Sequence, residues 1–144
     1  MIETIENEII KTLKENFEQF EVDSFPVEFQ HFQFTSHTGC LLVRYEDSTS
    51  EVQNTLTSVM SNEVHSFSVF LALRYLAKHI QAYQHVNKLK TVLNGLPILN
   101  KKLVLNKIEF IDNINGDLWY GAEISINLPI IDIYRDLSIA NKNI

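Results

Sequence analysis

Alternating apolar residues between positions 66 and 76 predict the central strand of a sheet. One side of an extended chain would carry Phe67, Val69, Leu71, Leu73 and Tyr75. The other side would carry Ser68, Phe70 and Ala72, so both faces of the strand can be covered. A buried helix is the alternative interpretation of so short an apolar run. The run is too short to cross a membrane, which requires roughly 20 apolar residues.

Two amphipathic helices are predicted, one on each side of this strand in the chain. The first has an apolar residue at every third or fourth position (Ile2, Ile5, Ile9, Leu13 and Phe17), which predicts a helix over residues 3–18. The second has the stripe Ala82, Val86, Leu89 and Leu93, which predicts a helix over residues 77–94. Gly95 and Pro97 follow it and are typical of a helix end.

The remaining segments predict further strands. Residues 19–37 are rich in aromatics and interrupted by Pro26, which indicates a short strand before the proline and then an extended segment packed on the core. Residues 40–45 predict another strand, and the polar residues 46–62 predict a loop or an exposed hairpin arm, suited to solvent or to a wet protein interface. Residues 103–110 and 118–128 predict a hairpin, because Asn115-Gly116 lies between them, and Pro129 should end its second strand.

These elements predict an α+β fold. The simplest arrangement is a two-layer sandwich with one mixed or mostly antiparallel sheet and two helices packed on one of its faces. We expect residues 1–144 to form a single domain and residues 130–144 to be a partly flexible C-terminal tail. Within that tail Ile131, Ile133 and Tyr134 are apolar and available to dock on a neighbour.

Composition and charge narrow the classes of partner. The chain has 144 residues, 45% hydrophobic and 21% charged, with a formal net charge of −6, which disfavours nucleic acid as the main partner because phosphate binding requires a cationic surface. The single cysteine, Cys40, cannot form an intramolecular disulfide and is interpreted as a small buried hydrophobe. The start of the chain carries Glu3 and Glu6, unlike a secretory signal, so we expect the protein to stay in the cytosol after synthesis.

No pattern of catalytic or ligand-binding residues is evident. The five histidines (His31, His37, His65, His79 and His85) lack the spacing of a metal site, and the paired carboxylates lie in predicted turns. His37 and Cys40 can meet across a turn, but a third, orienting group is missing. The four glycines form no phosphate-binding loop. We therefore expect no catalytic, metal-binding or cofactor-binding residues. Trp119 lies on the more polar face of its strand, where it either packs under another element or meets a partner.

Several segments occur in a characteristic order. They are Ile2-Glu3-Thr4-Ile5-Glu6, Leu42-Val43-Arg44-Tyr45-Glu46-Asp47-Ser48, Phe67-Ser68-Val69-Phe70-Leu71-Ala72-Leu73-Arg74, Tyr83 with Leu89-Lys90-Thr91-Val92-Leu93-Asn94-Gly95-Leu96, and Phe110-Ile111 followed by Gly116 and Leu118-Trp119-Tyr120. In this order and spacing the chain resembles, over about residues 2–128, the small tail-completion or tail-terminator proteins of Mu-like phages and prophages.

The resemblance implies a structural and non-enzymatic role. Proteins of the terminator type form a ring, for example a hexamer, which caps the finished tail tube and provides the surface that the head joins. The expected partners are further copies of the chain, the tail tube protein and a head-completion or connector protein, with neither membrane nor sequence-specific nucleic acid. The expected location is the tail of the virion, after assembly in the host cytoplasm.

A cyclic ring joins one patch of each subunit to a different patch of the next. The polar arm and the hairpin tip are the predicted patches, with Gln53, Asn54, Thr55, Thr57, Asn115, Asp117 and Trp119 as interface residues. One alternative is another head–tail joining or minor tail protein of the same module. The other is a small ligand-binding domain or enzyme, with a pocket between sheet and helices lined by Phe29, Phe32, Phe67 and Trp119.

Overall fold

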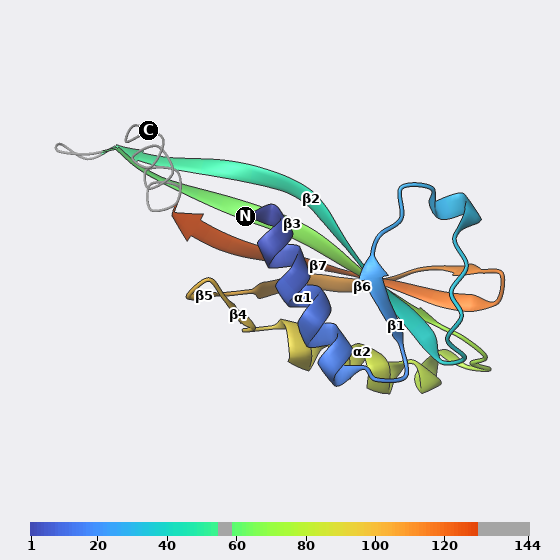
Figure 1. Ribbon diagram of the computed structural model, residues 1–144. Helices are drawn as coiled ribbons and strands as arrows, with labels where there is room; N and C mark the ends of the chain where they lie inside the picture. The colour runs from blue at the N-terminus through green and yellow to red at the C-terminus, as the bar shows by residue number, and fades with distance from the viewer. Residues whose placement is uncertain (55–58, 130–144) are drawn as a thin grey trace.

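A mixed five-stranded sheet forms the centre of the protein (Figure 1). The computed structural model describes residues 1–54 and 59–129, without the side chains of residues 51–61. The strands are β1 (Glu21–Ser24), β2 (Gly39–Asn54), β3 (Val59–Leu73), β6 (Val104–Ile114) and β7 (Asp117–Pro129). Their order is β1-β2-β3-β7-β6, and all pairs are antiparallel except β1 with β2. The predicted central strand is therefore confirmed as part of β3, the middle strand.

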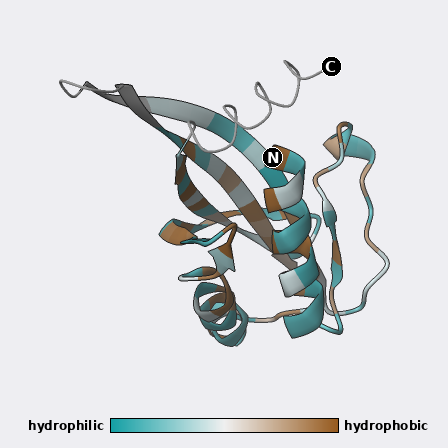
Figure 2. Ribbon diagram, turned by 60° about the vertical axis from the view of Figure 1, so that its left-hand side comes forward, coloured by the Kyte–Doolittle hydropathy of each residue, from teal (hydrophilic) through white to brown (hydrophobic). Residues whose placement is uncertain are grey.

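Two helices cover one face of this sheet (Figures 1 and 2). Helix α1 (Ile2–Asn16) contacts β1 and β2, and helix α2 (Tyr83–Leu93) contacts β6. Short 3-10 turns, η1 (Phe29–His31) and η2 (His79–Gln81), and a small two-stranded sheet of β4 (Pro97–Ile98) and β5 (Lys101–Lys102) complete the described residues. The α+β two-layer arrangement predicted from the sequence is confirmed.

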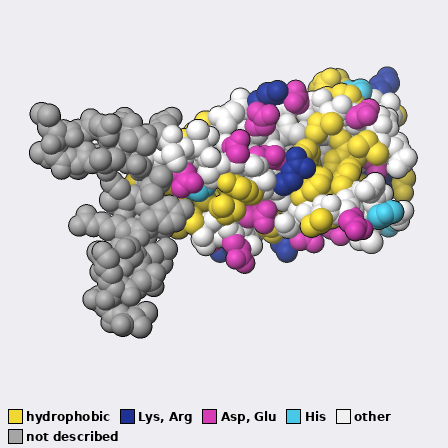
Figure 3. All heavy atoms as spheres, turned by 90° about the horizontal axis from the view of Figure 1, so that it is seen from above, with side chains coloured by type: hydrophobic (Ala, Val, Ile, Leu, Met, Phe, Trp, Pro, Cys, Tyr) yellow, Lys and Arg dark blue, Asp and Glu magenta, His cyan; other side chains and the backbone are white. Residues whose placement is uncertain are grey.

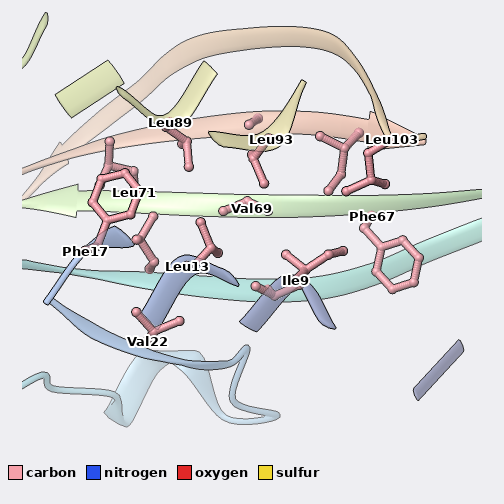
Figure 4. Packing of buried hydrophobic residues seen from close by; sticks show 14 of the residues in the cluster. Ile9, Leu13, Phe17, Val22, Phe67, Val69, Leu71, Leu89, Leu93 and Leu103 are labelled. Carbon is pink, nitrogen blue, oxygen red and sulfur yellow. The ribbon is translucent and has the colours of Figure 1, made fainter. Parts of the chain in front are cut away.

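The main core lies between the helices and the sheet, where every apolar stripe predicted from the sequence meets the others (Figure 4). Ile9 and Leu13 of α1 and Leu89 and Leu93 of α2 are fully buried and point toward Val69 and Leu71 of β3. The predicted apolar face of β7 is buried from Leu118 to Leu128. Burying one such leucine or isoleucine stabilises the fold by about 1.5–3 kcal/mol, so this layer dominates stability.

A second, smaller cluster covers part of the opposite face of the sheet. Its buried members are Phe34, Cys40, Leu42, Ala72 and Trp119. The aromatic segment after β1 packs over them: the ring of Phe29 meets Trp119 edge-on at 5.3 Å between centroids. The prediction of an extended segment packed on the core is confirmed. The pocket imagined between sheet and helices is wrong, because Phe67 lies in the main core whereas Phe29, Phe32 and Trp119 lie on the other face.

Two predicted segments differ from the structure. The second helix begins at Tyr83 and not at residue 77, because β3 ends at Leu73 and the chain then turns, with Tyr75 at φ +61° and 78% exposed. The side-chain oxygen of Gln81 accepts hydrogen bonds from the amides of Ala77 (2.8 Å) and Lys78 (3.0 Å), which holds this stretch as a turn. Tyr75 is therefore not part of the buried strand face that the alternation assigned to it.

The part of β2 and β3 beyond the β-bulge between Tyr45 and Asp47 is here called the arm; its described residues are 46–54 and 59–66. Of the two predicted alternatives, the hairpin arm is the one observed for the described residues of this stretch. The Asn115-Gly116 turn is confirmed as well, with φ of +54° and +88° at its two residues. The expectation for residues 130–144 lies outside the described residues.

We predict that Gly39→Ala destabilises the protein by about 3 kcal/mol, because a Cβ at residue 39 would collide with the backbone carbonyl of Ala72 and lie 2.9 Å from the ring of Phe20. Urea unfolding followed by circular dichroism measures the change. Asn127→Ala, on the exposed side of β7, is the control and should change stability by less than about 0.5 kcal/mol. Equal midpoints for both variants would contradict the close approach of β2 and β3 at Gly39.

Candidate functional site

The predicted interface residues lie at the two opposite ends of the sheet. Gln53 and Asn54 pair with Met60 and Val59 at the far end of the arm, and Thr55 and Thr57 lie outside the described residues. Asn115, Asp117 and Trp119 lie at the hairpin tip, beside the start of β2 and the end of β3. The fold thus separates the five described residues into an arm group (Gln53 and Asn54) and a tip group (Asn115, Asp117 and Trp119).

A groove of about 440 Å³ runs beside the hairpin tip. Its walls come from η1 and the residues after it, from the end of β3, and from the tip itself: Phe29, Gln30, Phe32, Gln33, Phe34, Arg74, Tyr75, Ile114, Asn115, Asp117 and Trp119. All three tip residues predicted from the sequence line this groove. In Figure 3 hydrophobic side chains gather toward the end of the visible face that lies away from the grey residues.

Arg74 organises the walls of the groove. Its Nη1 donates hydrogen bonds to the carbonyl oxygens of Phe34 (2.9 Å) and Ser36 (3.1 Å), and its Nε lies 3.5 Å from a carboxylate oxygen of Asp117. The guanidinium carbon lies 3.6 Å from the centroid of the Phe34 ring. Arg74 therefore ties the aromatic segment to β3 and to the hairpin. The only sequence signal for this role was a charged residue directly after the apolar run.

The three tip residues differ in how far they are available to a partner. Asn115 is exposed, whereas Asp117 is half-buried and engaged with Arg74. Trp119 is 5% exposed under Phe29, so the alternative of core packing is confirmed for it. A role of these residues in an interface stays a prediction.

A network of partly buried polar side chains joins β2 and β3 at the base of the arm. The hydroxyl groups of Tyr45 and Ser48 lie 2.5 Å apart, and Ser48 Oγ lies 2.8 Å from Nδ1 of His65, which is 1% exposed. A carboxylate oxygen of Glu63 lies 3.8 Å from Nε2 of His65, beyond hydrogen-bond distance. Ser48 and His65 come together only through the register of β2 and β3, so sequence analysis missed them.

Ser48, His65 and Glu63 are of the residue types that form the nucleophile, base and acid of a catalytic triad, but their geometry differs from that of a triad. In a catalytic triad the acid hydrogen-bonds the histidine and holds its tautomer, and the serine faces the substrate. Here the carboxylate of Glu63 is too distant for that bond, and His65 is closed off from solvent. The arrangement is suited to holding β2 and β3 together past the bulge.

The isolated titratable groups also lack a reactive setting. Burial, with Glu21 nearby, raises the pKa of the Cys40 thiol to about 12, so the thiol is protonated at neutral pH and is a poor nucleophile. Burial, with Lys88 nearby, lowers the pKa of His85. Among residues 1–54 and 59–129, no group of three or more His, Cys, Asp and Glu side chains is placed to hold a metal ion.

Comparison with known proteins identifies one family. Residues 9–136 match the model of a family described as Gp37 protein. No curated protein matches the chain. None of the described helices is long and apolar enough to span a membrane.

We predict that Arg74→Lys destabilises the protein by about 1–3 kcal/mol, because a lysine has neither the planar group that stacks on Phe34 nor a second nitrogen that can face Asp117 while the first donates to both carbonyls. Hydrogen exchange should show faster exchange of the amides between residues 34 and 39.

Arg44→Lys is the control: Arg44 pairs with Glu46 and lies over the rings of Phe25 (4.7 Å) and Phe70 (5.0 Å), so the substitution tests loss of stacking alone and should cost less than about 1 kcal/mol. A loss of stability no larger than that of the control would exclude the proposed anchoring role of Arg74.

We predict that stability falls with rising pH above about 9 because of Cys40. The folded protein keeps the thiol protonated up to a pKa of about 12, against an ordinary value of 9.0, so the unfolded chain releases this proton first. The contribution is fully present below pH 9 and is lost at up to about 1.4 kcal/mol per pH unit above it. Urea unfolding between pH 8 and pH 10.5 should show a shallower decline for Cys40→Ala than for the natural chain. Parallel declines would contradict the burial of the thiol as its cause.

Proposed function

The chain belongs to the Gp37 protein family, a family of phage proteins, and on this premise we propose that it is a tail terminator. In this role it caps the finished tail tube as an oligomeric ring and provides the surface to which the head joins. Its partners are further copies of itself, the tail tube protein and a head-completion or connector protein.

The family match carries the proposal. It covers residues 9–136, which include every strand of the main sheet, helix α2 and half of α1. The order of segments that resembles tail-completion proteins falls within nearly the same residues. The match therefore concerns the whole fold and not one isolated element.

The arm supports a role in assembly. Strand β7 accompanies β3 only as far as the pair of Asn62 with Pro129, so among the described residues the last part of the arm consists of β2 and β3 alone. An isolated two-stranded hairpin is marginally stable in water. Contact with a neighbouring protein would stabilise this part, which favours an interface at the arm over free exposure to solvent.

The tip supports a second contact. Asn115 is exposed. Tyr75 lies beside the groove and is 78% exposed, and its positive φ is energetically unfavourable for a bulky residue. Ring subunits need two different patches, and the arm and the tip supply two that differ in shape and in chemistry. The seven interface residues named from the sequence are part of this proposal.

We predict that deleting the gene from the phage or lysogen that carries it yields filled heads and separate, headless tails of abnormal length or with unfinished ends. Negative-stain electron microscopy of induced lysates shows the particles, and the natural gene supplied from a plasmid should restore infectivity. Intact infectious particles without the gene would exclude the proposal. Tails of normal length and finish that lack heads would instead assign the chain to another head–tail joining step.

A complementation series tests the arm separately. Replacing Ser50, Gln53 and Asn54 together by Lys should prevent rescue, because three ammonium groups without counter-charges would then be buried at the contact. The matched control replaces Glu123 and Asn127 by Lys on the uncovered face of the sheet, which changes the net charge by the same amount. Full rescue by the arm variant would mean that the arm is the wrong interface, while the deletion phenotype would still test the terminator role.

A further inference from the structure

The charges of this chain are unevenly distributed along the sequence. Residues 1–28 contain eight acidic and two basic residues. Residues 64–108 contain seven basic residues and no Asp or Glu. A net charge of −6 therefore conceals two segments of opposite sign.

The strand order places the acidic residues of α1 and β1 and the lysines around α2 and β6 at opposite edges of the sheet. Strand β1 and the accompanying α1 form one edge, and β6 with the accompanying α2 forms the other. We define the acidic edge as Glu3, Glu6, Glu21, Asp23 and Glu28 and the basic edge as Lys78, Lys90, Lys101, Lys102 and Lys107.

Side-chain contacts support this definition. A carboxylate oxygen of Glu6 accepts a hydrogen bond from Ser24 of β1 at 3.3 Å, and Glu3 lies one helical turn earlier on the same side of α1. Lys90 lines a hollow of about 310 Å³ together with Phe110 of β6, so it points toward the β6 edge. Lys88 is left out because its ammonium lies over the Phe17 ring, toward α1.

Most of these charges have no counter-charge within the described residues. The one salt bridge formed there by either edge joins Lys107 to Glu109 at 3.3 Å. The lysines of the basic edge are all exposed, as are Glu3, Asp23 and Glu28 of the acidic edge. Strand β6 also carries the exposed carboxylates Glu109 and Asp112, but the lysines of the basic edge outnumber them. Both edges thus present net charge that a partner of opposite sign can neutralise.

Large apolar side chains are exposed on the basic edge. Ile80 is 68% exposed, Tyr83 52%, Val104 51% and Phe110 44%. The corresponding exposed residues near the acidic edge are Ile2 and Val27. Lysines interspersed with exposed aliphatic and aromatic side chains are typical of a protein interface, whereas a phosphate backbone requires cations alone.

Strand β6, at the basic edge, is not suited to pairing with a strand of another molecule. Its pairing with β7 is irregular between Leu105 and Lys107 and between Phe110 and Asp112. Such bulges, together with edge charges, are features that prevent backbone pairing with another sheet. Contact at this edge must therefore be made by side chains.

We propose that the basic edge of one copy binds the acidic edge of the next copy, and that this contact closes the ring. The inference rests on the proposed terminator function. One chain carries both complementary surfaces, so head-to-tail contact pairs opposite charges at every interface, while two-fold contact of like edges would bring equal charges together. The arm and the hairpin tip, named under the proposed function, supply further patches of this subunit contact.

Charge reversal tests this contact. The basic-edge variant combines Lys78→Glu, Lys90→Glu, Lys101→Glu and Lys102→Glu, which reverses the sign of that edge. The acidic-edge variant combines Glu3→Lys, Glu6→Lys, Asp23→Lys and Glu28→Lys, which reverses the sign of the other edge; the combined variant carries all eight changes. Glu123→Lys with Asn127→Lys, on the uncovered face and outside both edges and the arm, is the control for a change of charge elsewhere. Thermal unfolding first establishes that each variant is folded.

In complementation of the deleted gene, each single-edge variant should lower the phage titre by about 100-fold or more, because like charges then face each other across every contact. The combined variant and the control should complement to within about tenfold of the natural gene, since the combined variant restores opposite charges. Full complementation by both single-edge variants, or a combined variant no better than either of them, would overturn the inference. The phenotype of the deletion tests the terminator function independently of these variants.

Sedimentation of the purified full-length variants gives a second test. The basic-edge variant has two acidic edges and the acidic-edge variant has two basic edges, so each should sediment as a monomer, while an equimolar mixture at low salt should associate. A mixture that stays monomeric would contradict the inference. A different result would instead make the basic edge a phosphate-binding surface. In that case the natural protein binds a short DNA duplex, the basic-edge variant does not, and the mixture of the two variants stays monomeric.

Discussion

The burial of β3 on both faces is the constraint on which the rest of the structure depends. Val69 and Leu71 point into the main core, while Ala72 belongs to the smaller cluster on the opposite face. A strand covered on both faces must lie inside the sheet, so β2 and β7 pair along its two sides. The helices, the aromatic segment and both ends of the sheet take their positions from this strand.

The two layers differ in how they are held. The helical layer is an apolar core in which α1 and α2 pack against β3 and β7, and its stability follows from buried area. The opposite layer is a single segment without regular secondary structure apart from η1, fastened by aromatic contacts and by Arg74. The uncovered remainder of that face carries polar and charged side chains such as Arg44, Glu46 and Glu123.

Two sets of polar or reactive side chains in the described residues take part in packing. The polar network of Tyr45, Ser48 and His65 joins two strands, and the Cys40 thiol is buried and protonated at neutral pH. By contrast, the two ends of the sheet and its two lateral edges differ from one another in shape, charge and apolar content. A subunit of a closed ring between a tube and a head connector needs surfaces that differ in this way.

The sequence by itself determined the elements and the layers, because apolar spacing of 2 or 3.6 residues reports which side of an element is buried. The stripe of Ile5, Ile9 and Leu13 and the turn at Asn115-Gly116 were predictable for this reason. Only the tertiary structure decided the start of α2, the position of Trp119 under Phe29 and the meeting of Ser48 with His65. These depend on strand order, on register and on turns between elements, which local spacing does not encode. The opposite signs of the two edges likewise became apparent only when the strand order separated segments that merely follow each other in the chain.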